Sequence, residues 1–113
     1  MGAHAADLYG RMTFERPRAV PNGLGGQVVD FVPVFEAHVK MRYLRGSETV
    51  IAARLAGKQP VVATVRRSRS AAAVTPEWRM RDLRSGLVYN IRAVVPSDDR
   101  RWIEITAESG VAL

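Results

Sequence analysis

Residues 35–43, Phe-Glu-Ala-His-Val-Lys-Met-Arg-Tyr, alternate apolar and polar side chains from the first residue to the last. A period of two places the apolar residues on one face of an extended chain, whereas a helix would need apolar residues three or four positions apart. The stretch therefore predicts a β-strand with one buried and one wet face, as in antiparallel sheets. Residues 28–32 are expected to be a partner or an extension of this strand, bent at Pro33.

Residues 11–16 show the same alternation closer to the N-terminus. Met12 and Phe14 would face the core, while Thr13 and Glu15 would face water. This is the signature of a second half-buried strand.

The segments that flank this strand read differently. Pro17 has no amide proton to donate to a neighbouring strand, so we expect the strand to end there. Residues 17–26, PRAVPNGLGG, combine prolines and glycines and predict a loop or hairpin connection with a projecting tip. Residues 1–10 are expected to be a flexible N-terminal arm, leaving residues 11–113 as a single domain.

One short helix is expected between Gly46 and Gln59. Ser47 is a suitable N-cap, Glu48 lies favourably in the first turn, and Gly57 is suited to end the helix. The apolar residues on one helix face are Val50, Ile51 and Leu55. This face would form a lid over the core or, alternatively, a groove for a partner.

Further strands are predicted in the second half of the chain. Residues 61–66, 87–95 and 102–106 alternate, a short strand precedes Arg84-Ser85-Gly86, and Pro96-Ser97-Asp98-Asp99 forms a turn. The expected core positions are Val61, Ala63, Val65, Leu87, Tyr89, Ile91, Ala93, Val95, Ile103 and Ile105. The total is mainly β: a small antiparallel β-barrel or sandwich of about six strands with one short α-helix.

Length and composition limit the remaining choices. A chain of 113 residues with 47% apolar and 25% charged residues suits one globular domain. It has no cysteine, which excludes disulfides, thiolate nucleophiles and cysteine zinc sites. No apolar run approaches the roughly 20 residues of a membrane span, and the N-terminus does not resemble a secretory signal. Synthesis and assembly in a cytoplasm are expected.

Residues suited to catalysis are scarce. His4 lies in the expected arm and His38 on the polar side of a strand, with no triad or metal pattern beside either. Asp98-Asp99 is more typical of a turn than of a metal site, and residues 22–26 lack the Lys-Ser/Thr of a phosphate loop. We therefore expect no enzymatic activity, no metal and no cofactor.

The chain is basic, with 17 Lys and Arg against 11 Asp and Glu and a net charge of +6. The densest positive segment is residues 66–70, which contain Arg66, Arg67 and Arg69. Such a cluster suits nucleic acid phosphates and the carboxylates of an acidic protein equally, and it could also be a solvated strand end.

Two tryptophans are candidates for anchoring contacts. Trp102 lies on the strand face opposite Ile103 and Ile105, where it could bind another protein. Trp78 follows Thr75-Pro76-Glu77 and could pin its loop to the edge of the core.

Taken in order, six short motifs resemble the head–tail joining (head-closure) proteins of tailed bacteriophages. They are Arg11-Met12-Thr13-Phe14-Glu15-Arg16-Pro17, Gly25-Gly26, Phe35-Glu36-Ala37, Gly46-Ser47-Glu48 with Ala52-Ala53, Gly86-Leu87-Val88-Tyr89-Asn90-Ile91, and Asp98-Asp99-Arg100-Arg101-Trp102-Ile103. The resemblance runs from about Tyr9 to Thr106. Residues 69–78 depart from it, because the family often has a shorter loop there.

The resemblance implies a small β-barrel or sandwich with a helix, acting in the neck of a phage, prophage or gene transfer agent particle. Such a protein would form a homo-oligomeric ring between a portal or adaptor ring and the tail terminator or tail tube, with packaged DNA in its channel. It would not engage a membrane, and it would assemble in the bacterial host cytoplasm.

Within such a ring, the candidate DNA-facing residues are the arginines Arg66, Arg67 and Arg69. The candidate contacts between subunits or rings are Asn22, Leu24, Trp78 and Trp102. Two other functions remain open: a tail terminator or other minor tail protein, and a free OB-like or SH3-like module that binds nucleic acid.

Overall fold

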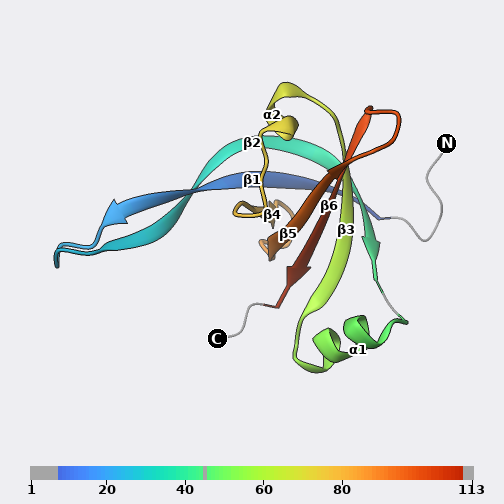
Figure 1. The fold of residues 1–113 in the computed structure, drawn as a ribbon, viewed down its shortest axis with the longest axis horizontal. Helices are drawn as coiled ribbons and strands as arrows, with labels where there is room; N and C mark the ends of the chain where they lie inside the picture. The colour runs from blue at the N-terminus through green and yellow to red at the C-terminus, as the bar shows by residue number, and fades with distance from the viewer. Residues whose placement is uncertain (1–7, 45, 111–113) are drawn as a thin grey trace.

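The computed structural model describes residues 8–44 and 46–110 (Figure 1). Six strands and two short helices follow one another as β1 (Leu8–Pro21), β2 (Gln27–Tyr43), α1 (Glu48–Leu55), β3 (Gln59–Arg66), α2 (Arg69–Ala72), β4 (Arg79–Asp82), β5 (Val88–Pro96) and β6 (Trp102–Ser109). The mainly β fold expected from the sequence is confirmed.

The strands form one closed antiparallel sheet in the order β1-β2-β3-β6-β5-β4. Closure is made by β1 and β4, which pair from Met12 opposite Asp82 to Glu15 opposite Arg79. Because β1 also pairs with β2, each strand has a neighbour on both sides within the body of the protein. Such closure removes the open edges that would otherwise favour aggregation.

The core fills the inside of the closed sheet. Its largest fully buried side chains are Phe14, Met12, Met80, Ile105, Val39, Val61 and Val65. Phe14 stacks on Phe35 of β2, with ring centroids 4.6 Å apart, and the Trp78 ring lies 6.4 Å from that of Phe35. The apolar positions predicted for residues 35–43, 61–66 and 102–106 point inward as expected, except that Tyr43 at the strand end is 38% exposed.

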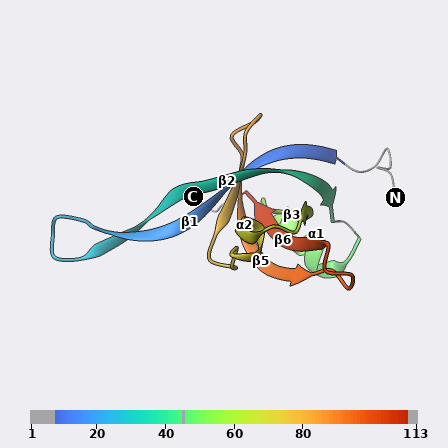
Figure 2. The same ribbon diagram turned by 90° about the horizontal axis from the view of Figure 1, so that it is seen from above.

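The first two strands continue well beyond the closed sheet as a two-stranded hairpin, which projects from the body in Figure 2. The expectation that Pro17 ends the first strand is wrong, since β1 continues to Pro21. Pro17 lies past the last residue that pairs with β4, so β1 has a neighbour on only one side there. A proline is tolerated in such an edge strand when its nitrogen faces the open side.

Two β-bulges change which residues face inward. In β2 the pairing shifts between Phe14 opposite Phe35 and Glu15 opposite Pro33, at the predicted bend. In β5 it shifts around Arg92, and the strand then presents its other face to the core. Val94 therefore packs against the core and Val95 is 55% exposed, which is the reverse of the strict alternation predicted from the sequence.

Glu15 and Thr13, expected to face water, are both buried, with Glu15 6% exposed. Residues of β4 lie beside them and cover them. Arg79 Nε donates a hydrogen bond to one carboxylate oxygen of Glu15, and Arg81 Nε donates to the other at 3.2 Å. The Arg79 guanidinium also lies 4.0 Å from the ring centre of Phe31, where the hairpin leaves the body.

The predicted helix is present as α1, but it is not a lid over the core. Ser47 caps it, as Ser47 Oγ accepts a hydrogen bond from the Val50 amide at 3.1 Å, and Gly57 follows it with φ of 83°. However, Leu55 is 85% exposed and Ile51 is 48% exposed, because α1 lies beside the start of β3 instead of across the end of the sheet.

A second helix, α2, was not predicted. It has four residues, too few for periodicity to show, and Ser68 Oγ caps it by accepting from the Ala71 amide at 3.0 Å. Ala71 and Val74 are buried, so this segment closes one end of the core.

At the N-terminus, β1 begins at Leu8, and residues 8–10 of the expected arm therefore belong to the strand. Residues 1–7 of that arm lie outside the described part of the chain.

We predict that Glu15→Ala lowers the free energy of unfolding by about 1–3 kcal/mol, because two partly buried arginines would lose their buried carboxylate partner. Guanidinium chloride unfolding would measure the change. The matched control is Glu36→Ala, whose carboxylate lies 3.6 Å from Arg11 with both side chains about half exposed. The control is expected to change stability by less than about 0.5 kcal/mol. Equal effects in the two variants would contradict the structural role of Glu15.

Candidate functional surfaces

The two ends of the closed sheet differ in chemistry. At one end lie the exit of β3, helix α2 and the turn between β5 and β6; α1 and the start of β3 lie at the opposite end (Figure 1). The hairpin formed by β1 and β2 projects sideways from the body (Figures 1 and 2). These three regions are the candidate functional surfaces.

The first end carries a cluster that we call the arginine surface. Arg66 pairs with Trp102 across β3 and β6, and the Arg67 amide donates a hydrogen bond to the Arg101 carbonyl at 2.9 Å. The fold thus brings the predicted cluster at residues 66–69 next to a second arginine pair, Arg100-Arg101, about thirty residues later in the chain. The members of the arginine surface, all exposed, are Arg66, Arg67, Arg69, Arg100 and Arg101.

In its pairing, the arginine surface differs from five of the nine other arginines that the structure describes. Several arginines elsewhere bind carboxylates, namely Arg11, Arg18, Arg79, Arg81 and Arg92. Within residues 8–44 and 46–110, no carboxylate lies within ion-pair distance of the five guanidinium groups of the arginine surface. Their charge is therefore directed to solvent.

Asp99, in the turn that carries Arg100 and Arg101, is occupied in shaping that turn. Asp99 Oδ1 accepts from Ser97 Oγ at 2.7 Å and from the Arg101 amide at 3.0 Å. These hydrogen bonds, chiefly that from Ser97, hold the pKa of the Asp99 carboxyl below its usual value. The predicted turn is present but lies one residue later, from Ser97 to Arg100, because Pro96 still belongs to β5, and Asp99 acts as a turn former.

The two tryptophans have different surroundings. Trp102 is 40% exposed, and the Arg66 guanidinium lies 5.8 Å from the centre of its ring. It therefore remains available for contact with another molecule. Trp78 is only 7% exposed and packs in the core against Phe35, so it pins its loop to the core, as the alternative prediction has it, and presents little surface to another subunit.

The hairpin tip, residues 22–26, presents one apolar side chain to solvent. Asn22 Oδ1 accepts hydrogen bonds from the amides of Leu24 at 2.8 Å and Gly26 at 3.1 Å. Gly23 and Gly25 have φ of 80° and 83°, values that glycine adopts without strain. Leu24 is 90% exposed on this fixed turn. Asn22 thus shapes the turn, and Leu24 is the side chain that it displays.

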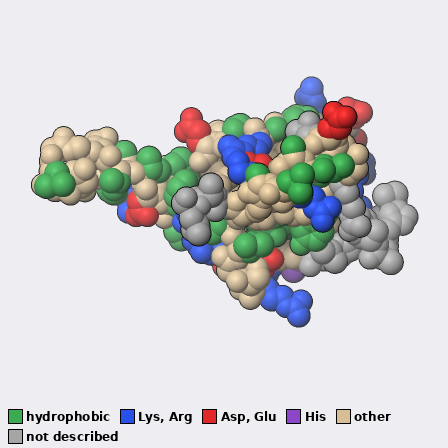
Figure 3. All heavy atoms as spheres, turned by 90° about the horizontal axis from the view of Figure 1, so that it is seen from below, with side chains coloured by type: hydrophobic (Ala, Val, Ile, Leu, Met, Phe, Trp, Pro, Cys, Tyr) green, Lys and Arg blue, Asp and Glu red, His purple; other side chains and the backbone are tan. Residues whose placement is uncertain are grey.

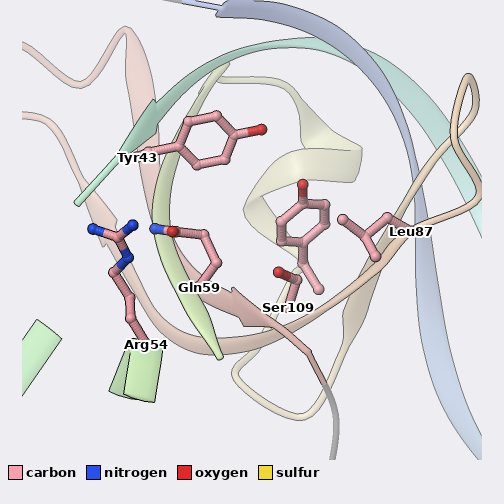
Figure 4. Close-up of a pocket in the computed structure, with 6 residues that line it drawn as sticks. Tyr43, Arg54, Gln59, Leu87 and Ser109 are labelled. Atoms are coloured by element: carbon pink, nitrogen blue, oxygen red, sulfur yellow. The ribbon is translucent and has the colours of Figure 1, made fainter. Parts of the chain in front are cut away.

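The opposite end contains a pocket of about 360 Å³ (Figure 4), lined by Tyr43, Arg54, Gln59, Leu87, Tyr89 and Ser109. Burial, assisted by the neighbouring Tyr43 hydroxyl, raises the pKa of Tyr89 well above its ordinary value. Hydrophobic side chains also lie on this face of the molecule and on the hairpin (Figure 3). The sequence did not indicate this pocket, because its residues come from five separate segments.

The described residues contain no group of three His, Asp or Glu side chains placed to hold a metal ion. His38 is exposed on β2, and His4 lies outside the described residues. No helix among the described residues is long and apolar enough to cross a membrane.

Comparison with known proteins gives a family and two structural neighbours. The family model for phage head completion proteins matches residues 3–110. The solution structure of a protein from Shigella flexneri 2a is similar, with a TM-score of 0.68 at 16% identity over 98% of this chain and 100% of that one. A chain in the virion of a native gene transfer agent particle matches with a TM-score of 0.60 at 21% identity, over 91% of this chain and 94% of that one. No protein of curated function matches the sequence significantly.

We predict that Tyr89 makes stability fall at alkaline pH. Its pKa is raised in the folded state, so the contribution is fully present below about pH 10 and is lost as the pH rises further, because the unfolded chain then ionises first. The absorbance of the 3 tyrosines at 295 nm, recorded against pH, should contain one late ionisation that coincides with unfolding. Tyr89→Phe should remove that step. An unchanged titration in this variant would show that another tyrosine is responsible.

Proposed function

This chain belongs to the phage head completion protein family, and from that premise we propose that it forms the ring that closes the DNA-filled head and joins it to the tail. The match over residues 3–110 is the observation on which the proposal rests, since it covers nearly the whole chain. A structural role in the phage head or neck follows from the family itself. The ring, the closing step and the partners below are proposed.

The distribution of surfaces supports assembly into a ring. A ring requires two different patches on each subunit, one complementary to the other, and not a single self-complementary patch. This chain has a projecting hairpin on one side and a body whose two ends differ, one arginine-rich and one bearing the pocket and α1. In the proposed ring, each subunit would contact its two neighbours through two different surfaces, one of which is the hairpin, and would contact adjacent rings through its two ends.

The hairpin is the part of the described chain with the fewest contacts to the rest of the fold. Beyond Glu15 it has two strands only, and such a ribbon is marginally stable in water on its own. It nevertheless exposes Val28 by 49%, Val29 by 66% and Leu24 by 90%. Contact with a neighbouring subunit or ring would cover these side chains and the open strand edges.

In the assembled particle we place a portal or adaptor ring on one side and the tail terminator or tail tube on the other. The particle is a phage, a prophage product or a gene transfer agent, with assembly in the bacterial host cytoplasm. The similarity to a chain of a gene transfer agent virion supports the fold required for this role.

We predict that Leu24→Asp blocks the joining of heads to tails while leaving the isolated chain folded. Leu24 makes no core contact, so the melting temperature should stay within about 2 °C, whereas a charge at the tip would oppose burial at an interface. The measurement is the fraction of tailed, DNA-filled particles seen by electron microscopy after complementing a knockout with the variant gene.

Leu24→Met is the control, because it keeps an apolar side chain of similar size, and it should support joining. A normal yield of tailed particles with Leu24→Asp would remove the hairpin tip from the proposed interface. Filled, closed heads that carry tails of abnormal length would instead indicate a tail terminator, the competing function.

A further inference from the structure

We infer that the arginine surface, including Arg100 and Arg101, binds the phosphate backbone of duplex DNA without reading its sequence. The inference deepens the proposed function, because it assigns the packaged DNA to one end of the closed sheet. It extends the three arginines predicted from the sequence to a surface built from two distant segments.

The positive charge of this surface is concentrated, and within the described residues its five arginines form no ion pair. Five exposed arginines lie on two segments that are joined by the hydrogen bond from the Arg67 amide to the Arg101 carbonyl. The same turn contributes two acidic residues, Asp98 and Asp99, so positive charge is in excess. Asp99 already accepts hydrogen bonds from within its turn. Guanidinium groups in such a position attract phosphates by charge and by their paired N–H donors.

The backbone at Arg100 gives a second, independent indication. Arg100 has φ of 59°, in the left-handed region, and is the only non-glycine residue with positive φ in the described part of the chain. Glycine or asparagine is the residue that such a turn position favours. An arginine there is less favourable for folding, and a strained residue of this kind is characteristic of functional sites.

The chemistry favours duplex DNA over a single strand or a protein. Single-stranded nucleic acid is held largely by bases stacked on aromatic rings, and Trp102 is the exposed aromatic residue here, with its ring partnered by Arg66. A protein interface would require apolar anchors, and among the described residues the exposed large apolar side chains at this end are Trp102 and Val95 alone. Backbone contacts made by arginine alone position a duplex and do not read its bases.

The test is the salt dependence of DNA binding by the full-length protein. Fluorescence anisotropy of a labelled 20-base-pair duplex would be recorded from low to moderate salt with the parent chain and with the variant Arg66→Gln, Arg67→Gln, Arg101→Gln. Removing one arginine–phosphate interaction lowers the slope of log K against log salt by about 0.9, so the slope of the triple variant should be smaller by about 2–3. A second duplex of unrelated sequence should bind equally well.

The matched control removes three exposed arginines elsewhere, by Arg42→Gln, Arg54→Gln, Arg84→Gln, with the same change in net charge. It should retain most of the parent slope. Arg100→Gly should lower the slope by about one while its melting temperature is unchanged or higher, since glycine fits the turn. That result separates impaired DNA binding from impaired folding.

Several outcomes would overturn the inference: no salt-dependent binding by the parent chain, or equal reductions of the slope in the triple variant and its control. Unchanged DNA binding by the triple variant, together with failure to join heads to tails, would assign the surface to an acidic protein partner. Failure of the proposed function can be distinguished from failure of this inference. Leu24→Asp tests the joining of heads to tails in the particle, and it should leave DNA binding by the isolated chain intact.

Discussion

The pairing of β1 with β4 is the interaction on which the rest of the structure depends. Four residue pairs, from Met12 with Asp82 to Glu15 with Arg79, turn a row of strands into a closed sheet. On the inner side Phe14 stacks on Phe35 and fills the core. On the outer side Glu15 is held by two arginines of β4, so that the seam is closed by apolar packing and by charge together.

The same seam explains the projecting hairpin. β4 has only four residues, whereas β1 has 14 and β2 has 17, and the two long strands must therefore leave the sheet once β4 ends. A bulge in β2 and the contact of Arg79 with Phe31 lie at the point of departure. The hairpin thus begins where β1 is still paired with β4 and presents Leu24 at a turn held by Asn22, which suits the proposed contact with a neighbouring subunit or ring.

The closed sheet also keeps its two ends apart and allows them to differ. Antiparallel connections place α2 and the β5–β6 turn at one end, and α1 and the pocket at the other. A protein that joins a DNA-filled head to a tail needs different chemistry toward its two sides. In the proposed role, this difference would come from the arginine surface at one end and from the pocket with the exposed Ile51 and Leu55 of α1 at the other.

The sequence by itself determined the mainly β class, the inward faces of most strands, the Ser47 cap, the existence of a turn after β5 and the family, because each of these depends on neighbours in the chain. Period-two alternation is local, and the order of short motifs is visible without coordinates. The exposed positions of Arg66, Arg67 and Arg69 also followed from the end of an alternating strand.

Only the tertiary structure decided the features that depend on pairing between distant segments. Glu15 is buried because β4 lies beside it. Strand β1 continues past Pro17 because it has no neighbour on one side there. Val94 faces the core because the pairing of β5 with β6 contains a bulge. The burial of Trp78 and the joining of Arg101 to Arg67 likewise arise from contacts across the closed sheet. A sequence pattern reports which face of a strand is apolar, but the strand that lies beside it is chosen by packing of the whole chain.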